Sequence, residues 1–84
     1  MLLFFYGEEC SHCHKMLPLV TKLEEETGAK IEKYEVWHNE DNKNKLEEHD
    51  KGLCGGVPFF FNTETKAHIC GAVDYDALQK WAGN

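Results

Sequence analysis

The sequence has no long apolar run, no basic patch and no low-complexity or repeated segment. No stretch approaches the length that a helix needs to cross a bilayer. The apolar residues 1–6 are too few for the core of a signal peptide and lack a basic flank. The formal net charge is −6 and the lysines are scattered among acidic residues, so neither nucleic acid nor an anionic membrane is an expected partner. We therefore expect a soluble, cytoplasmic protein.

The chain has only 84 residues, which limits it to one small hydrophobic core. Because it has no break in composition, we predict a single domain over residues 1–84, acting as a monomer. Its four cysteines would suit a small disulfide scaffold by number, but Cys10 and Cys13 form a Cys-x-x-Cys pair while Cys54 and Cys70 stand alone. In a reducing compartment such a pair is more often catalytic or metal-binding than structural.

The two isolated cysteines, Cys54 and Cys70, admit three interpretations. Isolated cysteines most often act as small buried apolar side chains, which is the interpretation that we favour. A regulatory thiol is the second. A Cys54–Cys70 disulfide is the third, and no feature of the sequence supports the geometry that it needs.

The Cys-x-x-Cys pair lies between an apolar run and a segment of helix length. The run Leu2–Tyr6 is typical of a buried strand, Gly7 ends it, and His14–Thr27 follows the pair with helical periodicity. A helix start leaves backbone N–H groups unpaired and carries the positive end of the helix dipole, which favours the thiolate of Cys10. The arrangement therefore predicts a site of thiol–disulfide exchange.

The remaining chain alternates strand and helix patterns. We predict strands over 31–37, 57–61 and 66–70, a helix from its cap at Asn39 to about Lys51, and a last helix capped by Asp74. The order β-α-β-α-β-β-α predicts an α/β fold with a four-stranded mixed sheet and helices on both faces.

Single residues refine this prediction. Gly28 is the expected end of the first helix, and Pro18 lies inside that helix, where we expect a kink because proline removes a backbone donor. Core packing is expected for Phe59, Phe60 and Phe61. It is also expected for Trp37 and Trp81, with Trp81 partly exposed near the C-terminus.

Together these features resemble the thioredoxin-fold redox proteins. The resemblance rests on Cys10-Ser11-His12-Cys13 after the first strand, Pro18 in the next helix, and Val57-Pro58 before the third strand. It covers nearly the whole chain and implies a thioredoxin-like fold. The segment Cys70-Gly71-Ala72-Val73-Asp74 is similar to the Gly-Gly-x-x-Asp stretch with which glutaredoxins hold glutathione. The family resemblance thus implies a small thioredoxin/glutaredoxin-like thiol–disulfide oxidoreductase.

The resemblance implies a role for each cysteine of the pair. Cys10 would be the nucleophile that forms a mixed disulfide with the substrate, and Cys13 the resolving thiol. His12 would stabilise the Cys10 thiolate, as the histidine at the same place does in protein disulfide isomerase, whereas the like charges of Glu8 and Glu9 would disfavour it. We expect the pKa of Cys10 to lie below the free-thiol value of about 8.5. We expect the reduction potential to lie above the thioredoxin value of about −270 mV.

The resemblance also implies where the substrate binds. Val57-Pro58 would carry a cis peptide bond that faces the cysteine pair, and the Val57 backbone would pair with the substrate chain like a strand. The other residues that we assign to the site are, for substrate binding, Cys70, Gly71 and Asp74 and, as its lining, Tyr6, Glu9 and Ser11.

The expected partners are protein disulfide substrates and a thiol reductant, which would be a reductase or glutathione. No metal and no other cofactor is implied. Two positions depart from thioredoxins, which carry tryptophan where this chain has Glu9 and a buried aspartate where it has Phe4. Without that aspartate, the proton of Cys13 would pass to His12 or to water.

A different class of function also fits the pair. Cys10 and Cys13 would then be two ligands of a zinc ion or an iron–sulfur cluster, completed by His12, His14, Cys54 or Cys70. Cys10-x-x-Cys13-His14 also matches the attachment motif of c-type haem, against which the preceding buried strand argues. A redox-inactive adaptor is a further alternative, against which the intact pair argues.

Overall fold

The computed structural model describes residues 1–83 and contains four strands and three helices within them. In chain order these are β1 (Leu2–Tyr6), α1 (Ser11–Thr27), β2 (Ile31–Glu35), α2 (Glu40–Asp50), β3 (Phe59–Asn62), β4 (His68–Cys70) and α3 (Tyr75–Trp81). The order of the elements is the predicted one. No helix in this part of the chain is both long and apolar enough to cross a membrane.

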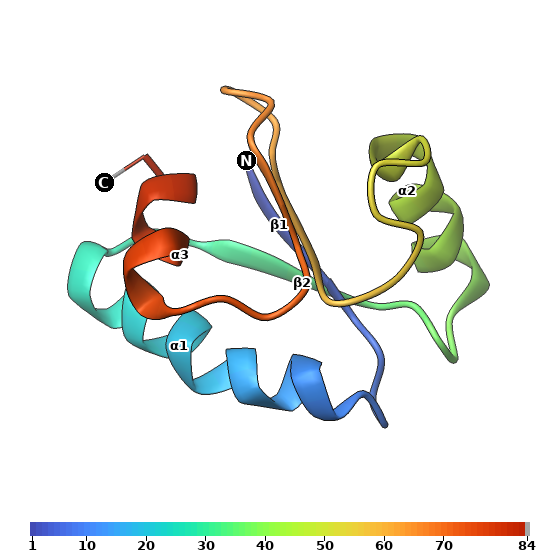
Figure 1. Cartoon of the computed structure of the whole chain (residues 1–84), viewed down its shortest axis with the longest axis horizontal. Coiled ribbons are helices and arrows are strands. Elements are labelled where there is room, and N and C mark those ends of the chain that lie inside the picture. The colour runs from blue at the N-terminus through green and yellow to red at the C-terminus, as the bar shows by residue number, and fades with distance from the viewer. Residues whose placement is uncertain (84) are drawn as a thin grey trace.

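The strands form one mixed sheet in the order β2-β1-β3-β4. β1 runs parallel to β2, with Tyr6 opposite Glu35, and antiparallel to β3, with Phe5 opposite Phe59. β3 and β4 form an antiparallel hairpin that places Phe59 opposite Cys70. Figure 1 shows α1 and α3 on one face of the sheet and α2 on the other, which confirms the predicted fold class.

Each face of the sheet has its own apolar core because side chains alternate along a strand. On one side Phe4 stacks on Phe60, with ring centroids 4.6 Å apart, and both are covered by α1 and α3. On the other side Phe5 and Phe59 pack with Leu46, the buried apolar side chain of α2. Because both faces of β1 are buried, that strand is apolar throughout rather than alternating.

Helix α1 begins at Ser11 with Cys10 as its N-cap, so the cysteine pair lies at the helix start, as predicted. The helical segment His14–Thr27 is preceded by residues 11–13, which also belong to the helix. Gly28 ends the helix as predicted, in the left-handed conformation with φ 73°. The helix continues through Pro18.

Both tryptophans were expected in the core, and the structure corrects this prediction for Trp37 and confirms it for Trp81. Trp37 is 52% exposed, not buried, because β2 ends two residues earlier than predicted and Trp37 lies in the loop before α2. Trp81 is only 4% exposed, since it packs edge-on against Phe60 in the α1–α3 core. The predicted caps Asn39 and Asp74 both occupy the N-cap positions of their helices.

Candidate functional site

A tight turn carries the chain from β1 to the start of α1. The N–H of Cys10 donates to the carbonyl of Gly7 over 3.0 Å, and this closes the turn around Glu8 and Glu9. The indole of Trp37 lies directly on Gly7, and a Cβ atom at this position would clash with the ring atom Cδ2. The backbone of the turn therefore approaches Trp37 as closely as only glycine permits.

Cys10 and Cys13 form a disulfide at the start of α1, with their Cα atoms 5.2 Å apart. The Cys10 Sγ accepts a hydrogen bond from the Cys13 N–H over 3.2 Å, so the sulfur lies at the positive end of the helix. Cys10 is 7% exposed and Cys13 is completely buried. Of the two sulfurs, Cys10 is thus the one that a partner can reach and the one whose thiolate the helix start stabilises.

The acidic turn before Cys10 is held by the loop after β2. The Glu9 carboxylate lies 2.7 Å from Nε2 of His38, and this hydrogen bond, together with the charge of Glu9, raises the pKa of His38. Desolvation opposes ionisation of Glu35, but the N–H groups of Glu8, His38 and Trp37 donate to its carboxylate and hold its pKa below the usual value.

His38 and Glu35 are site residues that the sequence reasoning missed. Because β1 and β2 are parallel, with Tyr6 opposite Glu35, their carboxyl ends meet at one edge of the sheet. The general rule that parallel strands bring their carboxyl ends to one edge of a sheet, applied to the predicted strands, was the signal that could have found these two residues. Because the two strand ends meet, Glu9 is paired with His38 and is not an unopposed negative charge beside Cys10.

The other predicted lining residues lie near the pair in different ways. Ser11 and His12 are exposed on the first turn of α1. His14, one turn on, makes a short hydrogen bond through Nε2 with the Glu8 carbonyl. Tyr6 is half-buried and stacks on Phe4, with ring centroids 5.5 Å apart.

The loop before β3 carries the remaining backbone of the site. The Val57–Pro58 peptide bond is cis, Pro58 is buried and Val57 is half-buried. The Gly71 N–H donates to the Pro58 carbonyl over 2.9 Å, which joins this loop to the end of β4. Asp74 is exposed, and its carboxylate accepts the Ala77 N–H as the cap of α3.

Cys54 and Cys70 form a second disulfide, with their Cα atoms 5.4 Å apart. The favoured interpretation, two buried isolated cysteines, was wrong: Cys70 is exposed and Cys54 half-buried. The reason lies in the register of the hairpin, which places Cys70 opposite Phe59, beside the start of the strand to which Cys54 leads. This pairing of distant residues has no local signature in the sequence.

A cavity of about 250 Å³ lies between the loop after β2, helix α2 and the loop before Pro58. Its apolar lining includes Val36, Trp37, Leu46 and Val57, and its remaining lining residues are Lys43, Glu47, Asp50, Gly55 and Gly56. The cavity reaches Val57, so it adjoins the backbone expected to bind substrate.

A metal ion has one candidate set of side chains within residues 1–83. Donor atoms of Glu8, Glu9 and His38 lie within 4.8 Å of one another, and all three residues are exposed. The set contains no cysteine, and all four cysteines of the chain are engaged in the two disulfides. The predicted alternative ligand set around Cys10 and Cys13 is therefore not assembled in this oxidised form.

The chain matches no protein-family model and no curated protein. Among solved structures it is similar to a mutant thioredoxin from Halobacterium salinarum NRC-1, at 30% sequence identity and a TM-score of 0.69. That match covers 94% of this chain and 67% of the thioredoxin. The chain belongs to the thioredoxin-fold redox proteins.

A second solved structure shows the same fold from another branch of this family. The glutaredoxin from Archaeoglobus fulgidus has a TM-score of 0.67 at 17% identity, and the match covers 99% of this chain and 86% of the glutaredoxin. Together with the Cys10–Cys13 pair at disulfide distance, membership of the thioredoxin-fold redox proteins supports a redox role through thiol and disulfide.

Proposed function

We propose that the chain is a thiol–disulfide oxidoreductase that reduces or exchanges disulfides in polypeptides. The observation that carries the proposal is the asymmetry of the pair. Cys10 caps α1 and keeps 7% of its surface exposed, whereas Cys13 is fully buried behind it. Cys10 is therefore the attacking thiolate and Cys13 the resolving thiol.

The reaction proceeds in two exchanges of the reduced pair. The Cys10 thiolate attacks one sulfur of the substrate disulfide, a Cys10–substrate disulfide forms, and the other substrate sulfur leaves as a thiolate that takes a proton. Cys13 then loses its proton to water or to His12 and attacks Cys10, which releases the second substrate thiol. The products are a reduced substrate and the Cys10–Cys13 disulfide, which an external thiol, from a reductase or glutathione, reduces again.

Substrate binding is proposed at the loop before β3. An extended polypeptide would pair with the Val57 backbone, a mode of recognition that reads main-chain groups rather than side chains. The cavity beside Val57 would take an apolar side chain of the same segment, because Trp37 and Leu46 form apolar parts of its wall. Gly71, bonded to the Pro58 carbonyl, would border the opposite side.

The surroundings of Cys10 support a reactive thiol. The helix start favours the thiolate, and the ion pair between Glu9 and His38 offsets part of the negative charge next to it. We therefore propose a thiol pKa for Cys10 below about 8.5. We also propose a reduction potential of the Cys10–Cys13 pair above about −270 mV.

The test is the rate at which a disulfide-bonded polypeptide is reduced in the presence of a thiol regenerant. The Cys10→Ser variant should lose the activity, because no other exposed sulfur lies at the helix start. The Glu25→Gln variant, altered at an exposed residue near the other end of α1, should keep it. Unchanged activity in Cys10→Ser, or stoichiometric zinc or iron in the purified wild-type protein, would overturn the proposal.

A further inference from the structure

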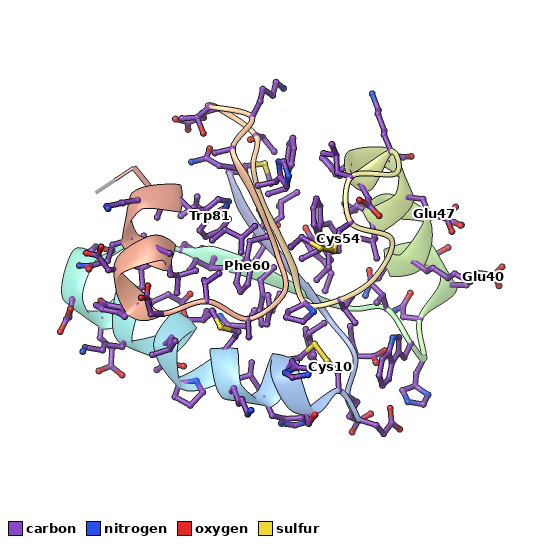
Figure 2. All side chains as sticks on the ribbon, in the orientation of Figure 1. Cys10, Glu40, Glu47, Cys54, Phe60 and Trp81 are labelled. Carbon is purple, nitrogen blue, oxygen red and sulfur yellow. A yellow bond between two sulfur atoms is a disulfide. The ribbon has the colours of Figure 1, made fainter. Side chains whose placement is uncertain are left out.

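The second disulfide lies beside the backbone that the proposed function assigns to substrate. Cys54 belongs to the loop between α2 and Pro58, and Cys70 is the last residue of β4, next to Gly71. The segment closed by the bond, with a sequence separation of 16, contains all of β3 and the turn of the hairpin. Figure 2 shows Cys54 on the α2 side of the hairpin, separate from Cys10 at the start of α1.

The loop of residues 51–57 has two attachments on opposite sides. On the α2 side the Asp50 carboxylate accepts the N–H groups of Cys54 and Gly55, the latter over 2.8 Å. On the sheet side the disulfide joins the loop to Cys70. The loop itself contains no helix or strand. Opening the disulfide therefore removes the cross-link between the loop and the end of β4. The main-chain connection to β3 and the hydrogen bonds to Asp50 remain.

The Cys54–Cys70 disulfide lies nearer the surface than the Cys10–Cys13 disulfide. Cys70 is exposed and Cys54 half-buried, whereas Cys10 and Cys13 are 7% and 0% exposed. Exchange requires an attacking thiolate to reach one sulfur in line with the bond, and exposure of Cys70 provides that access.

We propose that Cys54–Cys70 is a second redox-active pair, and that its closed form holds the substrate-binding loop in place. This inference rests on the proposed function of Cys10. In the opening step a dithiol attacks Cys70, a mixed disulfide forms, and Cys54 leaves as a thiolate that takes a proton. The second thiol of the dithiol then attacks its own mixed disulfide, Cys70 leaves as a thiol, and the dithiol ends as a disulfide.

The consequence falls on binding rather than on chemistry. With the disulfide closed, Val57 is pre-organised for a polypeptide, because the loop is already ordered before the substrate arrives. With the disulfide open, substrate binding must also order the loop, so the half-saturating concentration of a polypeptide disulfide should rise at least about fivefold. The limiting rate, and the reaction with a small aromatic disulfide that needs no backbone pairing, should not change.

The experiment has two parts. The first titrates the wild-type protein with dithiothreitol under native conditions and maps the free thiols by alkylation and mass spectrometry. The proposal expects Cys54 and Cys70 to become labelled while the chain stays folded. Labelling only after unfolding would overturn it.

The second part measures single turnovers of the Cys54→Ala/Cys70→Ala variant, with Cys10–Cys13 reduced, against polypeptide and small disulfides. The matched control is His68→Ala, an exposed residue of the same strand that does not hold the loop. A higher half-saturating concentration for the polypeptide alone supports the proposal, and an unchanged half-saturating concentration overturns it. Loss of reaction with both substrates in wild type would instead refute the proposed function.

If the double variant does not fold, hydrogen exchange of the wild type gives the same decision. The N–H of Gly71, which donates to Pro58, and the N–H of Gly55, which donates to Asp50, report the two sides of the loop. Opening the disulfide should speed exchange at Gly71 by at least about fivefold. Equal exchange in the two forms would overturn the proposal.

Discussion

Replacing Cys54 and Cys70 together with alanine should destabilise the oxidised chain by about 3 kcal/mol. The bond closes a segment with a sequence separation of 16, and the chain-entropy relation for such a segment gives about 3 kcal/mol at 25 °C. The same relation gives about 1.6 kcal/mol for Cys10–Cys13, whose separation is only 3. The physical reason is that the longer cross-link removes more conformations from the unfolded chain.

The assay is denaturant unfolding of the oxidised proteins, followed by far-ultraviolet circular dichroism. In thermal unfolding of the same proteins, the predicted loss corresponds to a fall in melting temperature of roughly 12–24 °C for a chain of this size. The Cys10→Ala/Cys13→Ala variant is the matched control, because it also removes one disulfide, and that disulfide closes a much shorter segment. A loss below about 1 kcal/mol for the Cys54/Cys70 variant, or a larger loss for the control, would refute the reasoning.

Three further predictions follow from packing and charge. Glu9→Gln should lower the pKa of His38 toward its ordinary value, as followed by proton NMR; because the folded pKa is raised, the Glu9–His38 pair stabilises the chain below about pH 6.5 and that contribution disappears as pH rises through the folded pKa. An unchanged pKa would contradict the pairing. Gly7→Ala should displace the Trp37 ring, change its fluorescence emission and cost about 1–3 kcal/mol in denaturant unfolding; unaltered emission would contradict the close contact. Leu46→Ala should cost about 2–5 kcal/mol and speed hydrogen exchange first in α2, since Leu46 is the buried apolar side chain of that helix; a loss under about 1 kcal/mol would contradict this.

The sequence predicted the parts of the site that lie close together along the chain. The apolar run of β1, the glycine after it and the Cys10–Cys13 pair at a helix start are local signals, and each reflects a local physical cause. The caps Asn39 and Asp74 were predictable for the same reason, because a cap bonds to the N–H groups of its own helix.

The parts that escaped prediction depend on contacts between distant segments. Trp37 was expected in the core from its apolar ring, yet it packs on Gly7 at the surface because β2 ends early. The Cys54–Cys70 disulfide depends on the register of the hairpin. The pairing of Glu9 with His38 depends on two parallel strands that end at the same edge of the sheet. None of these contacts leaves a periodic pattern in the sequence.

The central claim is that Cys10 attacks the substrate and Cys13 resolves the intermediate. The most direct measurement mixes the reduced Cys13→Ser variant with a disulfide-bonded polypeptide and locates the trapped adduct by mass spectrometry of its fragments. The account predicts one substrate chain attached to Cys10, stable until an external thiol is added. No adduct, or an adduct on Cys54 or Cys70 alone, would contradict it.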